Sequence, residues 1–470
     1  ENQNFSNRYG YSNTTDIDGL DVLLPRISFK YLATDNLTVR GGLGRFSGGS
    51  PGVWISNSYS NDGVISDSSN AFGVVNVPTS PDPTTGQYIP QDVLNALATE
   101  SPDGSVNALN PNFEIPTTLK VSLGGAYYAE DLPLLGEDWL FSADVLYNKL
   151  ENASYWYDQR CQQPVSTSPD GRGVYDCSGA PESIVVNSID EGDSLLYAFS
   201  ASRDWETNFG EFDIFASYTH ADVNDIGYGT SSTATSNYSD FAAYDRQSPR
   251  AGTSSFQTEH LFKVRFNWKK ELIPGYETKM SIFATRRTGQ PYSYTFNENN
   301  ACVLDIGGGR CSRESRNDDA GHLLYVPSGL NDPLFASSSF GGDVLAQQEF
   351  FNYISDSELA QYSGSIAPRN GDNSAWSTVI DLRIQQQLPA FTPEHRFTLF
   401  LDIENLGNLL NDDWGRIERT EYEYERAVVS AQIVDGQYEY FNLRSDSNIK
   451  NLEVLSQSVW QLQFGLKYEF

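Results

Sequence analysis

The chain has 470 residues, a formal net charge of −31 and a mean hydropathy of −0.45. This acidity argues against nucleic acid as a partner, since phosphate binding needs clustered lysine and arginine. No run approaches the ~20 apolar residues of a membrane-spanning helix, which excludes a helical membrane protein. It does not exclude membrane-spanning strands, which need only ~9–11 alternating residues.

Apolar and polar side chains alternate along the whole chain. A period of two is typical of β-strands with one apolar and one polar face. In chain order the pattern predicts about eleven strands, centred on residues 27–31, 37–43, 119–127, 139–147, 195–199, 212–218, 262–268, 280–284, 380–388, 397–403 and 459–470. The strand at 280–284 is expected to continue toward residues 292–296. The polar faces carry charges such as Lys263 and Asp381, as expected for a wet lumen or a solvated sheet.

The last predicted strand ends the chain on an aromatic residue. Trp460, Phe464, Tyr468 and Phe470 share its apolar face. This pattern resembles the closing strand of bacterial outer-membrane barrels, in which the terminal Phe belongs to the signal read by the barrel-assembly machinery. The alternative is the last strand of a soluble β-sandwich.

The predicted connections alternate between short and long. The short ones lie near residues 34–36, 130–137, 207–210, 272–277 and 389–393, and the long ones cover roughly 46–112, 157–193, 224–255, 297–375 and 418–455. Outer-membrane barrels have short periplasmic turns and long extracellular loops. Loops beyond ~15 residues are uncommon in compact soluble domains, which counts against the sandwich.

The strand count suggests that the barrel is incomplete. A periplasmic C-terminus and about eleven strands place the start of the first strand outside the cell. Bacterial single-chain barrels have an even number of strands, and an open sheet edge cannot face lipid. We therefore expect residues 1–470 to be the C-terminal part of a longer barrel protein, or to close with strands supplied elsewhere.

The four cysteines form two local pairs, each inside a long connection. Cys161 and Cys177 share one polar segment, and Cys302 and Cys311 share another. Short-range pairs of this kind predict two disulfides formed in an oxidising compartment. Metal binding is the weaker alternative, because neither pair has the histidine or CxxC spacing of a zinc site.

Several segments together resemble a known family. Residues 403–411, which read Ile-Glu-Asn-Leu-Gly-Asn-Leu-Leu-Asn and are followed by Trp414, resemble the NLF(D/N) motif in the penultimate strand of TonB-dependent receptors. The likeness is greatest to the Oar-type subgroup (OmpA-related, carboxypeptidase-regulatory-like). Segments 43–49, 53–63, 109–113, 286–294 and 366–370 are similar to that subgroup in the same order.

The resemblance implies a plugged barrel that imports a ligand by coupling to TonB. Such transporters have about 22 strands, so this chain would supply half of them. The family's plug, TonB box and regulatory-like domain are not visible in this sequence, and coupling is implied by the resemblance only.

The long loops contain candidate ligand-binding aromatics. Aromatic faces beside polar groups suit sugars, peptides or siderophore rings. The candidates are Trp54, Tyr59, Trp156, Tyr157 and Tyr244. The alternative is that these side chains pack against one another above the barrel rim or form interfacial belts.

Two neighbouring arginines and one acidic segment are the charged candidates. Arg286 and Arg287 could hold an anionic ligand in bidentate fashion, or could instead neutralise an acidic lumen. Residues 314–319 carry Asp318 and Asp319 and offer oxygen ligands for calcium, but without the spacing of an EF-hand.

No catalytic constellation is present, so we do not expect an enzyme or a resident cofactor. The histidines lie at positions 220, 260, 322 and 395, and none has the spacing of a zinc protease or a catalytic triad. We interpret them as solvated or strand-face residues and predict no metal site from them.

The sequence therefore predicts an all-β transmembrane antiparallel barrel in the outer membrane of a Gram-negative bacterium. The expected function is ligand capture by extracellular loops and TonB-coupled import. The expected partners are outer-membrane lipids, the assembly machinery, TonB through a region outside this chain, and an unknown ligand. A surface structural or adhesion protein and a passive porin are the two alternatives.

Overall fold

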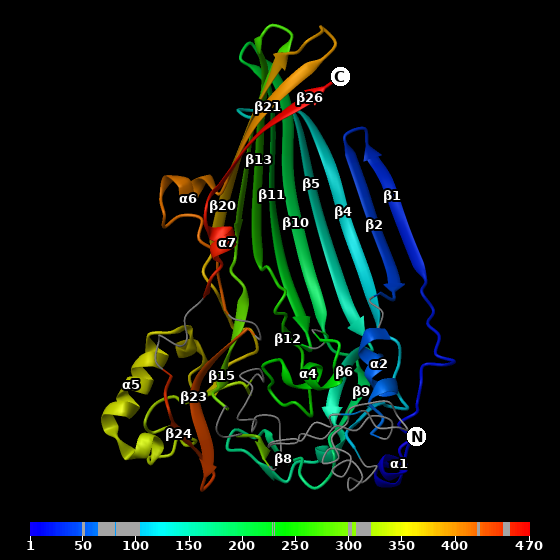
Figure 1. Ribbon diagram of the computed structural model, residues 1–470, viewed down its shortest axis with the longest axis vertical. Coiled ribbons are helices and arrows are strands. Elements are labelled where there is room, and N and C mark those ends of the chain that lie inside the picture. Colours follow the sequence, from blue (N-terminus) through cyan, green and yellow to red (C-terminus); the bar gives the residue numbers. More distant parts are fainter. Residues whose placement is uncertain are drawn as a thin grey trace.

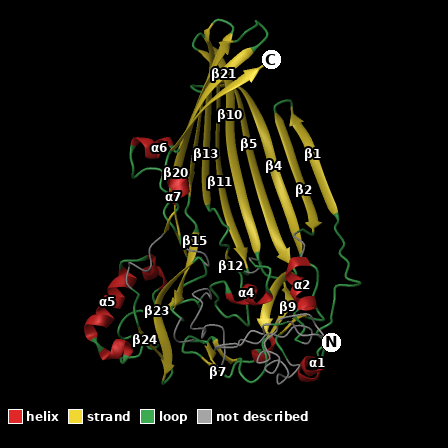
Figure 2. Cartoon of the chain, in the orientation of Figure 1, coloured by secondary structure: helices red, strands yellow, loops and turns green. Residues whose placement is uncertain are grey.

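The computed structural model in Figure 1 describes residues 1–48, 52–63, 80, 104–227, 229, 231–298, 303–306, 321–420, 424–444 and 452–470. One large twisted sheet forms the upper part of the view, and the long connections fold beneath it (Figures 1 and 2). Among the described helices, none is long and apolar enough to cross a membrane.

The large sheet is an antiparallel meander of eleven strands with one short addition. Its order is β1-β2-β4-β5-β10-β11-β13-β14-β20-β21-β26, and β12 also pairs with β11. The strands are β1 (Arg26–Thr34), β2 (Leu37–Phe46), β4 (Thr117–Leu132), β5 (Gly136–Glu151), β10 (Asp193–Thr207), β11 (Gly210–Asp225), β12 (Gly252–Thr253), β13 (His260–Ile273), β14 (Tyr276–Arg287), β20 (Ser377–Pro389), β21 (Arg396–Glu404) and β26 (Gln461–Glu469). The predicted all-β fold class and its eleven strands are confirmed.

One predicted strand boundary is wrong. β14 ends at Arg287, and residues 292–296 belong to β15 (Pro291–Phe296), which lies in a different sheet. Gly289 separates the two strands, and a Cβ atom there would lie 2.0 Å from the backbone oxygen of Ser374. The chain therefore passes close to the backbone of residue 374 at this point and leaves the large sheet, although the alternation of apolar residues resumes after it.

The two ends of the large sheet differ. Consecutive strands are joined by short turns at one end, which we call the turn end, and by long connections at the other, the loop end (Figure 1). Gly275 has a φ of +81° in the turn between β13 and β14, a left-handed conformation that suits glycine. The predicted alternation of short and long connections is thus present in the structure.

The large sheet has two free edges in the described part of the chain. β1 pairs only with β2, and β26 pairs only with β21. An edge strand presents unpaired backbone N–H and C=O groups, which can pair with a further strand.

The long connections are folded rather than extended. They form what we call the loop cap, at the loop end of the sheet (Figure 2). Its elements are α1 (Gln3–Tyr9), α2 (Gly52–Ser60), β3 (Val106–Leu109), β6 (Ala153–Asp158), η1 (Gln159–Cys161), β7 (Ser166–Thr167), β8 (Gly173–Asp176), β9 (Ser183–Ile189), α4 (Ala234–Ser239), β15 (Pro291–Phe296), β16 (Asp305–Ile306), β17 (Tyr325–Val326), η3 (Ser339–Gly342), α5 (Val344–Ser355), η4 (Glu358–Tyr362), β18 (Ser365–Ile366), β19 (Asp372–Asn373), β23 (Glu425–Val434) and β24 (Gln437–Phe441). The connection between β21 and β26 contributes β23 and β24 to the cap, and it also contains α6 (Leu406–Leu410), β22 (Glu418–Arg419), β25 (Leu452–Glu453) and α7 (Leu455–Ser458).

The loop cap holds the main buried apolar cluster of the described chain. This cluster joins β15, β23 and β24 to α5 and includes Phe296, Phe350, Val429 and Tyr440, all 0% exposed. β15 and β23 pair in parallel, although they are more than 120 residues apart in the chain. The cap is therefore a packed domain-like structure held together by contacts between different connections.

Asn405 fixes the chain where β21 ends. This residue of the 403–411 motif is 2% exposed and has a φ of +53°. Its side-chain amide donates hydrogen bonds to the backbone oxygens of Gly415 and Ser458, each at 2.9 Å. It thereby ties three parts of the last connection together, which is a structural role for the motif.

Candidate functional site

The large sheet exposes its apolar face. Phe199 is 53% exposed, Val264 is 42% exposed, and Phe464 is 68% exposed. Large apolar patches on a protein surface mark contact with a partner or a membrane. Alternation along every strand places these side chains on the same face, so the patch extends across the whole sheet.

Two rows of aromatic rings border the apolar face. At the turn end, Trp205, Phe212 and Trp268 lie directly opposite one another on β10, β11 and β13. The Trp205 and Phe212 rings stack with centroids 5.2 Å apart, and the Trp268 indole N–H donates to the backbone oxygen of Phe209 at 2.9 Å. We call this row the turn-end belt. An amphipathic ring of this kind suits the boundary between an apolar and an aqueous phase.

The second row lies on the same three strands at the loop end. Tyr197, His220 and His260 are opposite one another in the sheet, and Trp376 stacks on His260 with centroids 5.8 Å apart. We call this row the loop-end belt. It contains the tyrosine, tryptophan and imidazole rings that combine an apolar body with a polar tip.

The spacing of the two belts can be compared with the apolar band of a membrane-spanning barrel. On β10 the belts lie at residues 197 and 205, and on β13 they lie at 260 and 268, which is eight residues apart in each case. At ~3.3 Å per residue this is roughly 26 Å along a strand, which is about 19–22 Å across a bilayer if the strands are tilted by ~35–45°. Outer-membrane barrels have an apolar band ~25 Å tall between two aromatic girdles. The two belts are therefore slightly closer together than such girdles, and the apolar face between them suits a membrane-spanning wall.

The opposite face of the sheet is polar and carries ion pairs. Arg40 donates two hydrogen bonds of 2.8 Å to the carboxylate of Asp144, although β4 lies between their strands. The pair can span β4 because Gly124 lies between them, and a Cβ atom there would collide with Asp144. Farther along the sheet, Arg265 pairs with Asp213 at 3.0 Å. These charged side chains remain substantially exposed, as expected for a face in contact with water.

The structure separates the two candidate arginines. Arg286 lies on the apolar side of β14, where its guanidinium is 5.3 Å from the centroid of Trp376 in the loop-end belt. Arg287 follows on the polar side and lines a cavity of about 290 Å³. Arg419 and Glu418 of β22 and Gln290 also line this cavity. The cavity lies where the loop end of the sheet meets its connections, and its two guanidinium groups suit an anionic ligand.

The loop cap buries charged groups of its own. Arg172 is fully buried, pairs with Asp170 at 2.6 Å, and donates to the backbone oxygen of Leu323 at 2.8 Å. Glu298 and His322 form a second buried pair at 3.0 Å. Burial raises the pKa of Glu298, but the charge and hydrogen bonding of His322 outweigh it and hold this pKa at about 2. Each pair lies within one connection, and the hydrogen bond from Arg172 to Leu323 joins two different connections.

Two buried tyrosines share one carboxylate. The hydroxyls of Tyr292 and Tyr294 both donate to Asp372, the latter at 2.8 Å. Burial, followed by the influence of neighbouring tyrosine and carboxylate groups, raises the pKa of Tyr294 far above its ordinary value. Arg426 lies over the Tyr292 ring at 3.9 Å. These contacts join β15, β19 and β23, so their role is to hold the cap together.

The aromatic ligand candidates are distributed through the loop cap. Trp156 is 1% exposed in a cluster with Tyr238, and Tyr157 is 6% exposed and packs near Phe5. Tyr244 is half-buried, with Arg250 over its ring at 4.2 Å. Tyr59 is 51% exposed on α2, and the backbone of Trp54 lies on the same helix. Among the four whose side chains the structure describes, Trp156 and Tyr157 lie in two different buried clusters, whereas Tyr59 is exposed.

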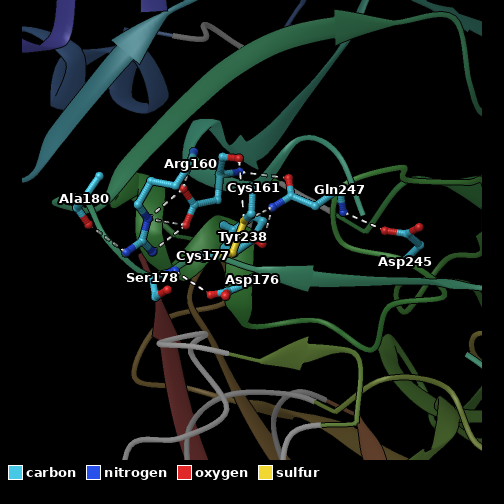
Figure 3. Close-up of a disulfide and its surroundings, with 10 residues drawn as sticks. Arg160, Cys161, Asp176, Cys177, Ser178, Ala180, Tyr238, Asp245 and Gln247 are labelled. Carbon is cyan, nitrogen blue, oxygen red and sulfur yellow. Dashed lines mark hydrogen bonds and ion pairs between the residues drawn. A yellow bond between two sulfur atoms is a disulfide. The ribbon is translucent and has the colours of Figure 1, made fainter. Parts of the chain in front are cut away.

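One disulfide lies inside the cap (Figure 3). Cys161 at the end of η1 and Cys177 after β8 are bonded, with 3% and 2% exposure. The side-chain amide of Gln247 contacts the Cys161 sulfur at 2.9 Å and the Tyr238 hydroxyl at 3.1 Å. The disulfide thus closes a loop within the 157–193 connection, and Gln247 joins this loop to the 224–255 connection. Cys302, Cys311 and the calcium candidates at 314–319 lie outside the described residues.

The residues of the assembly-signal prediction lie on and beside β26. Phe464 and Tyr468 are on the apolar face of this strand, and Trp460 and Phe470 flank it. Tyr468 packs against Phe397 of β21 with ring centroids 5.1 Å apart, and Phe470 is 94% exposed. The last aromatic side chain is therefore accessible to a partner.

The sheet brings together one cluster that the sequence does not predict, which consists of His220, Glu259 and His260. His220 and His260 lie opposite each other on β11 and β13, and Glu259 lies beside them. The two histidines are forty residues apart in the chain, so no local spacing signals their contact. Only the register of the two strands could reveal it.

Comparison with known proteins gives structural likeness without a family. No family model and no curated protein matches this sequence. One similar solved structure is the outer membrane transporter YddB from Escherichia coli, with a TM-score of 0.38 and 10% identity over 88% of this chain. Another is the ferric enterobactin receptor PfeA from Pseudomonas aeruginosa, with a TM-score of 0.36 and 9% identity over 95% of this chain. A third is the siderophore receptor PirA from Acinetobacter baumannii, with a TM-score of 0.33 and 10% identity over 82% of this chain. This chain spans 37–39% of the length of those proteins. At TM-scores below 0.5, the similarity assigns neither a family nor a function.

Proposed function

We propose that this chain forms part of the wall and the extracellular cap of an outer-membrane receptor in a Gram-negative bacterium. The observation that carries the proposal is the pair of aromatic belts that border an exposed apolar face of the sheet. A soluble protein would have to cover this face. The turn end would lie in the periplasm and the loop cap outside the cell.

The two free edges support a larger barrel. A sheet edge cannot face lipid, because the bilayer offers no hydrogen bonds to unpaired backbone groups. Further strands must therefore pair with β1 and β26 to close the wall. In this proposal residues 1–470 form the C-terminal part of a TonB-dependent receptor barrel, and its plug lies outside this chain.

The ligand would bind at the loop end of the sheet, between the end of β14 and the connection that contains β22. The cavity lined by Arg287 and Arg419 opens there, and both guanidinium groups suit a carboxylate, phosphate or other anionic oxygen. The packed loop cap would hold its walls in place. Import through a TonB-gated plug is the step that we infer from the family resemblance of residues 403–411.

A matched pair of arginine substitutions tests the membrane assignment. Ala201 lies on the apolar face midway between the belts of β10, and Ser200 lies beside it on the polar face. Arg on a lipid-facing position at the bilayer midplane costs about 2–4 kcal/mol. We expect Ala201→Arg to reduce insertion into the outer membrane, as measured by membrane fractionation and resistance to urea extraction. Ser200→Arg should insert normally, and equal behaviour of the two variants would contradict a lipid-facing apolar surface.

A second pair of variants tests ligand capture and import. Arg287→Gln removes a guanidinium from the cavity, and Arg286→Gln removes one from the opposite face of the same strand. In cells supplied with a panel of labelled anionic chelates, we expect uptake that requires the proton-motive force and falls in Arg287→Gln but not in Arg286→Gln. Binding without energy-dependent uptake would support the adhesion alternative. Constitutive ion conductance in bilayers would support a passive porin.

A further inference from the structure

The loop-end belt contains three metal-ligating side chains in contact. One potential ligand atom from each of His220, Glu259 and His260 lies within 4.8 Å of the other two. The His260 Nε2 atom is 3.5 Å from a Glu259 carboxylate oxygen, and the two imidazole rings stack with centroids 4.9 Å apart. All three residues are half-buried, so they are accessible from outside.

The second nitrogen of each imidazole is already engaged. The His220 Nδ1 atom lies 3.0 Å from the backbone oxygen of Glu259. Because a carbonyl oxygen can only accept, His220 must carry its proton on Nδ1, which leaves a lone pair on Nε2. The His260 Nδ1 atom lies 3.0 Å from the Tyr218 hydroxyl, which can accept in the same way. Histidines that bind metals almost always donate their other N–H to an outer partner of this kind.

The sheet fixes the positions of these ligands. Directly opposed residues on antiparallel strands have Cβ atoms ~4.5–5.5 Å apart, which keeps two imidazoles on one side of the sheet. Ligand atoms on a tetrahedral metal are about 3.3 Å apart for metal–nitrogen bonds of ~2.0–2.1 Å. The cluster therefore needs only a small side-chain rotation to close around an ion. Trp376 stacks on His260 and limits the other positions open to that ring.

We propose that His220, Glu259 and His260 form a binding site for a borderline divalent transition metal such as Zn²⁺. Two imidazoles and one carboxylate are a ligand set that zinc prefers, with a fourth position for water. A role in the loop-end belt alone would explain why these residues have aromatic rings. It would not explain why a Glu259 carboxylate oxygen lies beside the Nε2 atom of His260, or why the Nδ1 atom of His220 is hydrogen-bonded to a backbone oxygen.

The proposed ion would join β11 to β13 at the base of the connection between them. That connection contains α4 and the residues that pack around the disulfide, including Tyr238 and Gln247. Metal binding would therefore reduce opening of this part of the loop cap. This inference is independent of the proposed receptor function, because it depends only on the register of two strands and the residues beside them.

Titration of the purified, chelator-treated full chain with Co²⁺ tests the proposal, followed by displacement with Zn²⁺. We expect one ion per chain, with the visible absorption of four- or five-coordinate Co²⁺. His220→Gln and His260→Gln should each weaken Zn²⁺ binding at least ~100-fold. Tyr218→Phe removes only the hydrogen-bond partner of His260 and should weaken Zn²⁺ binding about 10-fold. Thermal unfolding without metal should be the same in all variants, which separates a lost ligand from a lost fold.

The matched control is His395→Gln. This histidine lies at the turn end and contacts the Tyr468 hydroxyl, so its removal should leave Zn²⁺ affinity unchanged. Undiminished Zn²⁺ binding in His220→Gln, or an equal loss in His395→Gln, would overturn the site.

Discussion

The large sheet and the loop cap place their apolar side chains in opposite environments. In the sheet, Phe199 and Phe464 are exposed on a face that extends between two aromatic belts. In the cap, Phe296 and Phe350 are completely buried in a cluster built from several connections. Phenylalanine is therefore exposed in the sheet and buried in the cap of the same chain. In the proposed barrel the apolar face of the sheet would gain its stability from lipid, whereas the cap gains its stability from its own core.

Charged residues show the same division. Arg40 and Asp144 pair on the polar face of the sheet with 49% and 43% exposure. Arg172 and Asp170 pair in the cap with 0% and 3% exposure. Exposed ion pairs contribute little to stability, whereas breaking a buried pair leaves an uncompensated charge. The cap is therefore the part of the molecule in which single substitutions should have large effects.

The largest expected effect is that of a cavity in the cap core. Phe296→Ala removes a buried ring that packs against Tyr438 at a centroid distance of 5.5 Å. Such truncations cost about 3–5 kcal/mol. We expect the free energy of cap opening, measured by hydrogen exchange of β15 and β23 amides, to fall by this amount. Phe199→Ala is the control on the apolar face of the sheet and should leave exchange in the cap unchanged. Equal effects would remove the distinction between the two regions.

Loss of the disulfide should have the next largest effect. Cys161 and Cys177 are 16 residues apart, and closing a loop of this size contributes about 3 kcal/mol. We expect the double variant Cys161→Ser, Cys177→Ser to become sensitive to protease within residues 157–193. Insertion and the heat-modifiable migration of the barrel should not change, because both cysteines lie in the cap, outside the strands of the large sheet. Loss of insertion would show that the cap is needed to assemble the wall.

The sequence predicts the sheet far better than the cap for a physical reason. Successive side chains of each sheet strand point to an apolar face and a polar face in turn. Each strand segment therefore shows a period of two in its own sequence. The eleven strands follow from this local pattern, and the structure shows that they pair in chain order. The cap instead depends on contacts such as the parallel pairing of Ser293 with Glu425. No local pattern encodes a partner at that separation.

The candidate sites also differ in whether their residues are close in sequence or are brought together only by the fold. Cys161 and Cys177 are close in sequence, so their spacing alone suggests a bond. Arg286 and Arg287 are also adjacent, yet alternation sends them to opposite faces of β14, which the sequence pattern could have revealed. The pairing of His220 with His260 requires the strand register, which the pattern does not supply.

A smaller effect is expected from one half-buried glutamate in the cap, Glu425. Burial raises the pKa of Glu425 to about 7, and the nearby charge of Glu298 adds to this. In the unfolded chain a glutamate titrates near ~4.3, so only the unfolded cap ionises between pH ~4.3 and ~7. Cap stability should therefore fall by about 1–3 kcal/mol as the pH rises through this window.

Glu425→Gln should abolish that pH dependence. Its side-chain oxygen can still accept the hydrogen bond that the Gly321 N–H donates at 2.8 Å. Hydrogen exchange or thermal unfolding of the cap at pH 5 and pH 8 measures the difference. Glu298 has a pKa of about 2, so its contribution to stability is present above pH ~4.3 and is lost only as the pH falls toward 2. The two windows do not overlap, and a pH dependence that persists in Glu425→Gln would assign the effect to another group.

The smallest expected effect tests whether the polar face of the sheet is wet. Arg40→Gln breaks an exposed pair and should cost about 0.2–1 kcal/mol, less at high salt. Arg172→Gln breaks the buried pair of the cap and should cost about 3–5 kcal/mol with little salt dependence. Urea unfolding in detergent at two salt concentrations compares them. If Arg40→Gln cost as much as Arg172→Gln, Asp144 would be left as an uncompensated charge away from water. The polar face would then be packed against protein, such as a plug, rather than lining an aqueous lumen.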